Sequence, residues 1–385
     1  MTYLTHLECS QCHRQFNAQE VHTFCPDCTA PLLARYDLKK ARSELDREYI
    51  RCSPRGIWRW KELLPVCEPS NIISLGEGDT PLLHLPRLGE QLALPHLYVK
   101  DESLNPTGTF KARGLSTAVS KAREFGLNRV IIPTAGNAGG AMAAYAARGG
   151  LQACILMPVD TPRANLEECR ITGAQVILVD GLISDAARQA TEKVKSEDWF
   201  DLSTFKEPYR VEGKKVMGYE LAEALDWRLP DVIIYPTGGG TGLVGMQKAF
   251  SELDDMGWLE NVGKPRLIAV QAEGCAPVVK AFNNSTPVCE YWENAQTLAS
   301  GLRVPRSFAD RIILQDIRAS GGYAIAVSDE QILGAQRQLA ITEGIFAAPE
   351  GAATLAGLAK LLEKGLIHPG EKIVLFNTGS GLKYI

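Results

Sequence analysis

Short apolar stretches alternate along the chain with longer segments whose apolar residues recur at helical spacing. One such segment, residues 110–125, places Leu115, Ala118 and Ala122 on one face and stops at Gly126, which predicts a helix. Seven short stretches are bounded by turn residues and are interpreted as strands buried on both faces. They cover residues 97–99, 130–133, 153–157, 176–179, 232–235, 267–270 and 373–376. The alternation predicts an α/β fold with mainly parallel sheets.

Length and charge narrow the possible partners. The 385 residues are 45% hydrophobic and 22% charged, which indicates two or three packed domains. With 41 basic and 45 acidic residues, the chain has no overall positive field for nucleic acid or an anionic membrane. No apolar run approaches the roughly 18 residues that span a bilayer, and residues 1–10 lack an export pattern. We therefore expect a cytoplasmic protein that binds a small molecule.

The cysteines are unevenly distributed. Four of the ten, Cys9, Cys12, Cys25 and Cys28, form two C-x-x-C pairs near the N-terminus. Four thiolates can close a tetrahedral shell around Zn²⁺, and a shell without an open position indicates a structural metal. Residues 7–36 are too few to bury a core of their own, so a metal would stabilise their fold. A redox dithiol or a chance spacing is the less favoured alternative, because one redox pair would not need a second pair.

The loops that follow the predicted strands hold unusual residues, and ligands of parallel α/β folds bind at such loops. The glycines of residues 238–242 follow a strand and open a helix, so their N–H groups can surround a phosphate. Residues 240–245 also satisfy G-x-G-x-x-G, and the next strand ends at Glu273. A dinucleotide-binding oxidoreductase is therefore an alternative. The four loops cover residues 100–111, 133–139, 236–242 and 377–381.

Lys111 is the candidate nucleophile. It lies in the first turn of its predicted helix, where a cation opposes the helix dipole. Burial beside Phe110 would lower the pKa of its amine and favour imine chemistry, whereas the alternative is an ordinary solvated lysine. A lysine for an aldehyde, a glycine cradle for a phosphate and an asparagine for a ring oxygen together fit pyridoxal phosphate.

Several motifs resemble those of the fold-type II pyridoxal-phosphate enzymes, the tryptophan synthase β-like group, and among them the threonine synthases. The motifs cover nearly the whole chain and lie at residues 76–81, 105–114, 135–138, 210–214, 237–242 and 378–383. The resemblance implies that Lys111 carries the cofactor covalently and moves protons as a base. It implies a cofactor site made of Phe110, Lys111, Asn137, Gly238, Gly239, Gly240, Thr241, Gly242 and Thr378.

The resemblance also implies an activity. A hydroxyl such as that of Thr378, facing the pyridine nitrogen, does not keep that nitrogen protonated, which favours elimination and replacement over transamination. The implied reaction converts O-phospho-L-homoserine and water to L-threonine and phosphate. Thr134, Lys206 and Arg210 would contact the substrate, with Arg210 at its phosphate. The alternative for Arg210 is a surface ion pair.

The sequence departs from the family pattern on the substrate side. Ala112 stands where many threonine synthases have aspartate, and Ala138 stands where a threonine is common. Ser380 and Tyr384 replace a usual histidine and aspartate. A related lyase or β-replacement enzyme acting on threonine, serine or phosphoserine is therefore the second hypothesis.

The domain organisation expected from these patterns has a zinc-ribbon-like segment, a connector and two domains, with the active site between the domains. Homodimers are usual in the family, so a homodimer is expected. The predicted limits are 1–36 for the ribbon, 37–72 for the connector, 73–111 with 206–385 for the large cofactor-binding domain, and 112–205 for the small α/β domain.

Overall fold

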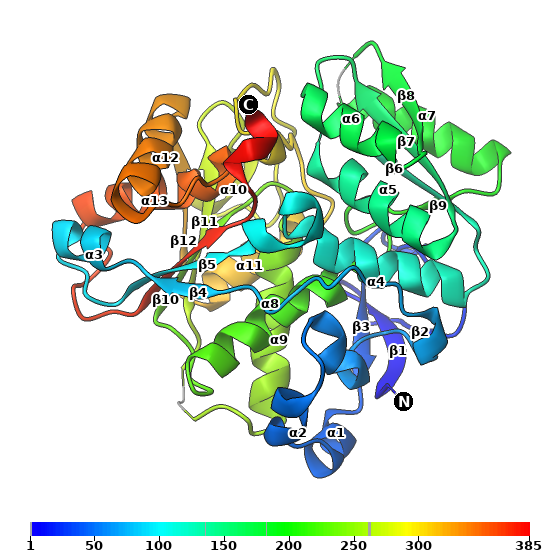
Figure 1. Cartoon of the computed structure of the whole chain (residues 1–385), viewed down its shortest axis with the longest axis horizontal. Coiled ribbons are helices and arrows are strands. Elements are labelled where there is room, and N and C mark those ends of the chain that lie inside the picture. The colour runs from blue at the N-terminus through cyan, green and yellow to red at the C-terminus, as the bar shows by residue number, and fades with distance from the viewer. Residues whose placement is uncertain (1, 135, 182, 261–262) are drawn as a thin grey trace. The chain divides into compact units, whose positions relative to one another are not determined.

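The chain divides into two compact units, and each is described by itself. The computed structural model describes residues 2–134, 136–181, 183–260 and 263–385 (Figure 1). The domain limits expected from the sequence stay a prediction. Unit 1 comprises Met1–Asp79, Asn105–Val216 and Ser251–Trp258, and unit 2 comprises Thr80–Leu104, Met217–Phe250 and Leu259–Ile385.

Unit 1 begins with a small antiparallel sheet in the order β2-β1-β3, which we call the ribbon. Its buried side chains, including Leu7, Cys25 and Leu32, belong to the same apolar cluster as α4 and α5. The ribbon therefore has no separate core. The first elements are β1 (Leu4–Cys9), β2 (Gln15–Asn17), β3 (Leu32–Tyr36), α1 (Leu38–Glu44), α2 (Arg47–Cys52) and two 3₁₀ helices (Ile57–Leu63 and Pro69–Asn71).

The main sheet of unit 1 is parallel, in the order β8-β7-β6-β9. Alternate residues of its strands face different helices. Val130 and Ile132 pack in the cluster that contains α4 and α5, whereas Ile131 packs with the α7 side chain Ala186. The elements are α4 (Lys111–Glu124), β6 (Arg129–Pro133), α5 (Asn137–Gly149), β7 (Gln152–Pro158), α6 (Arg163–Ile171), β8 (Gln175–Val179), α7 (Ile183–Ser196) and β9 (Phe200–Asp201).

One predicted strand differs from expectation. The stretch at 176–179 does form strand β8, but this strand is not buried on both faces, since Leu178 is 43% exposed. The reason is its position at the edge of the sheet, where it has one neighbouring strand. An apolar stretch therefore predicted the strand correctly and its burial wrongly.

Unit 2 is built on a six-stranded sheet in the order β12-β11-β10-β13-β5-β4, parallel except for the edge pair β4 and β5. Helix α13 packs on this sheet through a large apolar cluster. The elements are β4 (Leu82–His84), α3 (Pro86–Leu92), β5 (Leu97–Asp101), β10 (Val232–Pro236), α9 (Thr241–Asp255), β11 (Arg266–Ala272), α10 (Pro277–Asn283), α11 (Asp310–Ala319), β12 (Tyr323–Val327), α12 (Asp329–Glu343), α13 (Pro349–Glu363) and β13 (Ile373–Asn377). Helix α8 (Arg210–Ala224) begins in unit 1 and ends in unit 2.

The expected α/β fold with mainly parallel sheets is confirmed. All seven apolar stretches form strands, and the helix expected at 110–125 is α4. Among the described helices, none is both long enough and apolar enough to cross a membrane.

Candidate functional site

Lys111 is the first residue of α4 and follows Phe110, as the sequence predicted. Its ammonium nitrogen lies 4.2 Å from the centre of the Phe110 ring. The side chain is half-buried, and its backbone N–H donates a 3.3 Å hydrogen bond to the hydroxyl of Thr109. Lys111 is therefore a partly desolvated cation at the positive end of a helix.

Two glycines let α4 and α8 approach closely within unit 1. A Cβ on Gly114 would lie 2.6 Å from the carbonyl oxygen of Arg210, and a Cβ on Gly213 would lie 2.2 Å from that of Arg113. Both contacts are shorter than any side chain tolerates, so only glycine fits at either position. This close approach brings the first turn of α8 beside the first turn of α4.

Arg210, the first residue of α8, is almost fully buried at 1% exposure. One guanidinium nitrogen donates a 2.6 Å hydrogen bond to the carbonyl of Leu202. The carboxylate of Glu207 accepts hydrogen bonds from the N–H groups of Tyr209, at 2.6 Å, and Arg210, at 3.0 Å. Burial raises the pKa of Glu207 to about 7, and the charge of Arg210 partly opposes this. Arg210 is therefore not part of a surface ion pair.

Lys214 lies one turn further along α8. Its side chain is fully buried, and its ammonium nitrogen lies 5.4 Å from the centre of the Phe110 ring. Burial, followed by the charges of Arg210 and Lys111, holds its pKa well below the usual value. Unit 1 thus gathers Lys111, Arg210 and Glu207 around Lys214.

Two substrate candidates, Lys206 and Thr134, and the cofactor candidate Asn137 also lie in unit 1. Lys206 is half-buried, and its ammonium lies 3.6 Å from the carboxylate of Asp201. Thr134 follows β6, and its hydroxyl accepts a 3.2 Å hydrogen bond from the N–H of Gly136. Asn137 is the first residue of α5 and is half-buried. Ala135, which belongs to the same motif, lies outside the described residues.

The glycine run of unit 2, residues 238–242, lies at the start of α9 and is called the cradle below. Gly240 has φ +77°, and a Cβ on Gly238 would lie 2.2 Å from the carbonyl oxygen of Gly301. Within the described chain, no hydrogen bond is found from the backbone N–H groups of residues 238–242. Free N–H groups at a helix N-terminus suit an anion such as a phosphate.

Thr378 lies at the same edge of the unit 2 sheet as this cradle. It follows β13, which pairs in parallel with β10, and the cradle follows β10. Thr378 is 6% exposed, and the preceding Asn377 donates a 2.8 Å hydrogen bond to Asp101 at the end of β5. Unit 2 therefore places a glycine-rich loop and a hydroxyl at the carboxyl ends of adjacent parallel strands, where ligands of such folds bind.

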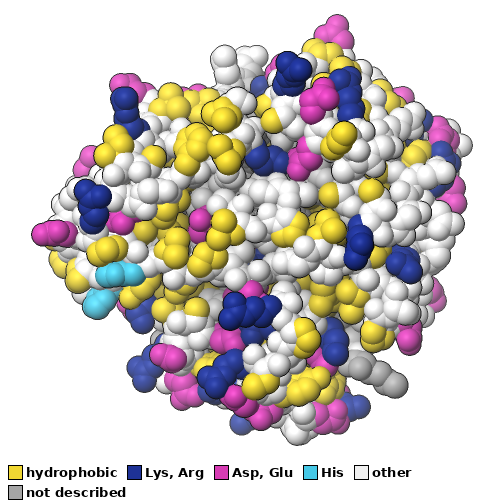
Figure 2. All heavy atoms as spheres, in the orientation of Figure 1, with side chains coloured by type: hydrophobic (Ala, Val, Ile, Leu, Met, Phe, Trp, Pro, Cys, Tyr) yellow, Lys and Arg dark blue, Asp and Glu magenta, His cyan; other side chains and the backbone are white. Residues whose placement is uncertain are grey.

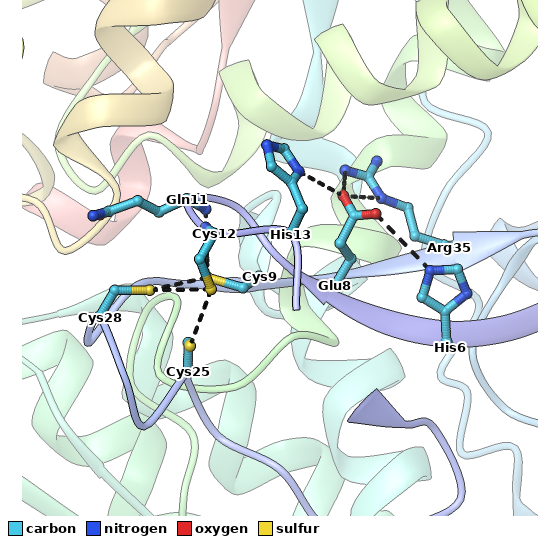
Figure 3. A network of polar contacts seen from close by, with 9 residues as sticks. All are labelled: His6, Glu8, Cys9, Gln11, Cys12, His13, Cys25, Cys28 and Arg35. Atoms are coloured by element: carbon cyan, nitrogen blue, oxygen red, sulfur yellow. Dashed lines mark hydrogen bonds and ion pairs between the residues drawn. The ribbon is translucent and has the colours of Figure 1, made fainter. Parts of the chain in front are cut away.

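The four N-terminal cysteines converge at one end of the ribbon (Figure 3). Their sulfur atoms all lie within 4.8 Å of one another. In each C-x-x-C pair the residue after the second cysteine has a positive φ, 61° for His13 and 50° for Thr29, and donates its N–H to the carbonyl of the first cysteine. The two pairs are thus similar turns that present four thiols to one point, which suits a metal ion.

The residues that depart from the family pattern have structural partners. Ala112 is fully buried in the apolar cluster of unit 1, and Ala138 is 8% exposed in the same cluster. Ser380 accepts a 3.2 Å hydrogen bond from the N–H of Leu382, and the hydroxyl of Tyr384 donates one of 2.7 Å to Glu350.

Sequence reasoning gave no role to Lys214, Glu207 or Gly114. A signal for Lys214 was present, because Arg210 and Lys214 are spaced by four residues and so share a helix face. No signal in the sequence showed that this face would be buried against α4.

Comparison with known proteins agrees with this geometry. Residues 73–379 match the family described as "Pyridoxal-phosphate dependent enzyme". The threonine synthase of Methanocaldococcus jannaschii is 36% identical over 97% of this chain and 92% of its own length. That of Methanosarcina acetivorans is 35% identical over 98% of this chain and 92% of its own. Both matches therefore include most of the ribbon.

Solved structures share the fold. Threonine deaminase isoform 2 from Solanum lycopersicum superposes with a TM-score of 0.68 at 22% identity, covering 85% of this chain and 92% of that one. A fungal L-serine ammonia-lyase from Rhizomucor miehei superposes with a TM-score of 0.67 at 23% identity, covering 79% of this chain and 94% of that one. From the family match and the similarity to these relatives, the chain belongs to the pyridoxal-phosphate-dependent enzymes.

Proposed function

We propose that this chain is a threonine synthase, which converts O-phospho-L-homoserine and water to L-threonine and phosphate. The observation that carries the proposal is the 35–36% identity to curated threonine synthases over 97–98% of the chain. The lysine of α4 and the glycine cradle of unit 2 support it, because they are the groups that the cofactor requires.

The described residues fit pyridoxal phosphate. The free N–H groups of residues 238–242 match its phosphate, and the crowding at Gly238 leaves no room for a side chain in that cradle. Thr378 would face the ring nitrogen, Asn137 the ring oxygen and Phe110 the ring. When bound, the cofactor withdraws electrons from the α-carbon of the substrate.

Lys111 supplies the proton transfers. Its amine would take the proton from Cα and then one from Cβ. Phosphate would leave from Cγ, protons would return to Cγ and to Cα, and water would add its hydroxyl group at Cβ and give its proton to the released phosphate. Partial burial beside Phe110 reduces the contact of Lys111 with bulk water.

The test measures phosphate and threonine formed from O-phospho-L-homoserine by the cofactor-loaded enzyme. Both products should appear in equal amounts. The variant Lys111→Ala should lose at least about 10³-fold in rate, because no other amine takes its place. Ammonia released from serine or threonine, with no threonine formed from the phosphorylated substrate, would contradict the proposal and favour a lyase.

The four cysteines of the ribbon hold one structural zinc ion in this proposal. A Zn–S bond of about 2.3 Å places thiolates of a tetrahedral site about 3.8 Å apart. The separation of 3.8 Å between Cys12 and Cys25 agrees with this value, whereas that of 3.2 Å between Cys9 and Cys28 is shorter. With four protein ligands, the ion would have no open position for catalysis.

Metal analysis of the purified protein tests the zinc site. The wild type should contain about one zinc per chain, and Cys28→Ser should contain almost none. Cys52→Ser is the matched control, since Cys52 is exposed and lies outside the cluster. A folded wild type without metal would rule the site out.

We also propose a cytoplasmic homodimer with a small-molecule amino-acid substrate. The resemblance to the family supports the dimer, and light scattering on the purified protein tests it. On the face drawn in Figure 2, basic and acidic side chains are interspersed, which supports the absence of a nucleic-acid partner.

A further inference from the structure

Lys214 differs from its neighbour Lys215 although both side chains are fully buried. Lys215 forms ion pairs with Glu212 at 2.7 Å and Glu252 at 3.0 Å. The ammonium of Lys214, in contrast, has no hydrogen-bond partner in the part of the chain that the structure describes. One lysine is thus neutralised within the fold, and the other is not.

The charged groups around Lys214 include more cations than carboxyl groups. The charged groups that act on it are Arg210, Lys111 and Glu207, which are two cations and one carboxyl group. Both oxygens of Glu207 accept hydrogen bonds from the start of α8. Gly114 also clears space for the ammonium, since a Cβ there would lie 2.8 Å from the lysine nitrogen.

A buried amine without a hydrogen-bond partner is costly, and a ligand that supplies the partner would explain why the fold retains it. An anion would supply the partner, and the guanidinium of Arg210 beside Lys214 favours an anion with several acceptor oxygens over a carboxylate. A phosphate monoester carries close to two negative charges and three acceptor oxygens. Arg210 and Lys214, one helical turn apart, can share those oxygens.

We propose that Lys214 binds the phosphate group of the substrate, together with Arg210. The inference rests on the proposed function, which supplies a phosphate a few bonds from the carbon that Lys111 deprotonates. Lys214 is then a specificity-determining residue for a phosphorylated substrate. Burial and the neighbouring cations lower the pKa of Lys214 and a bound phosphate would raise it, so phosphate binding should be coupled to proton uptake by the amine.

Calorimetry with inorganic phosphate tests this on the cofactor-loaded enzyme. Titrations at pH 8 in two buffers of different ionisation enthalpy give both the affinity and the number of protons taken up. Lys214→Met should bind phosphate about 10- to 100-fold more weakly and lose the proton uptake. Lys193→Met, which removes a half-buried lysine of α7 in the same unit, should change neither. Unchanged affinity and uptake in Lys214→Met would overturn the proposal.

Two other groups could account for proton uptake or for the pairing of Lys214. Glu207 could take the proton, so uptake that disappears in Glu207→Gln and persists in Lys214→Met would overturn the proposal. The cofactor could be the partner of Lys214. If Lys214→Met retains the cofactor more weakly but binds phosphate as the wild type does, the proposal is overturned as well. If this variant retains the cofactor fully and binds phosphate more weakly, the proposal is supported.

Stability separates a binding role from a structural role. Removing a buried amine that has no hydrogen-bond partner should raise the thermal unfolding midpoint of Lys214→Met by a few degrees. The paired neighbour should behave oppositely, and Lys215→Met should unfold at a lower temperature or fail to fold, because it leaves Glu212 and Glu252 without their cation. A fall in the midpoint of Lys214→Met would indicate a structural role and contradict the proposal.

The outcomes distinguish this inference from the proposed function. If the wild type forms threonine and Lys214→Met binds phosphate as tightly as the wild type, the role of Lys214 is refuted and the proposed function is not. Phosphate binding with proton uptake that depends on Lys214, but without threonine formation, would refute the threonine synthase proposal and support the anion site.

Discussion

The two units offer different chemistry to an anion. In unit 2 the cradle at residues 238–242 consists of backbone N–H groups at the start of α9. In unit 1 the corresponding groups are the charged side chains of Lys111, Arg210 and Lys214. Backbone donors do not titrate and suit a group that stays bound, such as a cofactor phosphate. Side chains can change their protonation state and suit a group that arrives and leaves in each turnover.

The largest loss of activity should come from a substitution at Gly213, which separates α4 from α8 in unit 1. In Gly213→Ala the new Cβ would lie 2.2 Å from the carbonyl oxygen of Arg113. The clash is with helix backbone, which cannot move aside without moving the helix. The helices must separate, which moves Arg210 and Lys214 away from Lys111. We expect kcat/KM to fall by more than about 100-fold, with about 1–3 kcal/mol of lost stability.

A helical glycine in open space provides the control for Gly213. Gly334 lies within α12, and a Cβ there would meet no atom within 4 Å. Gly334→Ala should raise the free energy of unfolding by about 0.5–1 kcal/mol and leave kcat/KM unchanged. Full activity in Gly213→Ala would show that the close approach of α4 and α8 does not position the lysines.

A smaller effect should follow from filling the cradle of unit 2. Gly238→Ala would place a Cβ 2.2 Å from the backbone oxygen of Gly301, so the loop must shift. We expect about 10- to 100-fold weaker retention of pyridoxal phosphate, measured by its absorbance after dialysis, and unchanged binding of inorganic phosphate at Lys214. Gly370→Ala is the matched control, because a Cβ there meets nothing within 4 Å. Equal retention in both variants would contradict the assignment of the cradle.

The smallest effect concerns the carboxyl group of Glu207. Its pKa is raised from 4.5 to about 7 in the folded protein, so the folded state keeps a proton that the unfolded chain has released. The free energy of unfolding should therefore decline as the pH rises from about 4.5 to 7, by at most about 1.4 kcal/mol per pH unit, and level off above.

Denaturant titrations of Glu207→Gln across this pH range check the effect. The variant should lack this part of the decline and should gain stability relative to the wild type as the pH rises. Parallel stability curves for the two proteins would show that Glu207 does not titrate in this window.

Local features of the chain could be predicted from the sequence. The start of α4 at Lys111, the turn at Gly126 and the two C-x-x-C turns each depend on a few consecutive residues. The glycine cradle was recognisable for the same reason, since its conformation and the helix that follows are encoded together.

Features that depend on distant segments could not be predicted in this way. The burial of Arg210 and Lys214 depends on the contact of α8 with α4, which lies about a hundred residues earlier in the chain. The exposure of β8 depends on the strand order, which the apolar pattern does not contain. In both cases the sequence specified the element and tertiary packing specified its surroundings.

The ribbon is joined to the rest of unit 1 through a shared core. Leu7, Cys25 and Leu32 belong to one apolar cluster with α4 and α5, and the hydroxyl of Tyr36 donates a 2.9 Å hydrogen bond to the buried Glu212. Truncating residues 1–36 would therefore expose the apolar surface of α4 and α5 to solvent and leave Glu212 without this donor. A shortened chain would tend to aggregate instead of yielding a smaller soluble enzyme, so attempts to trim this protein should begin elsewhere.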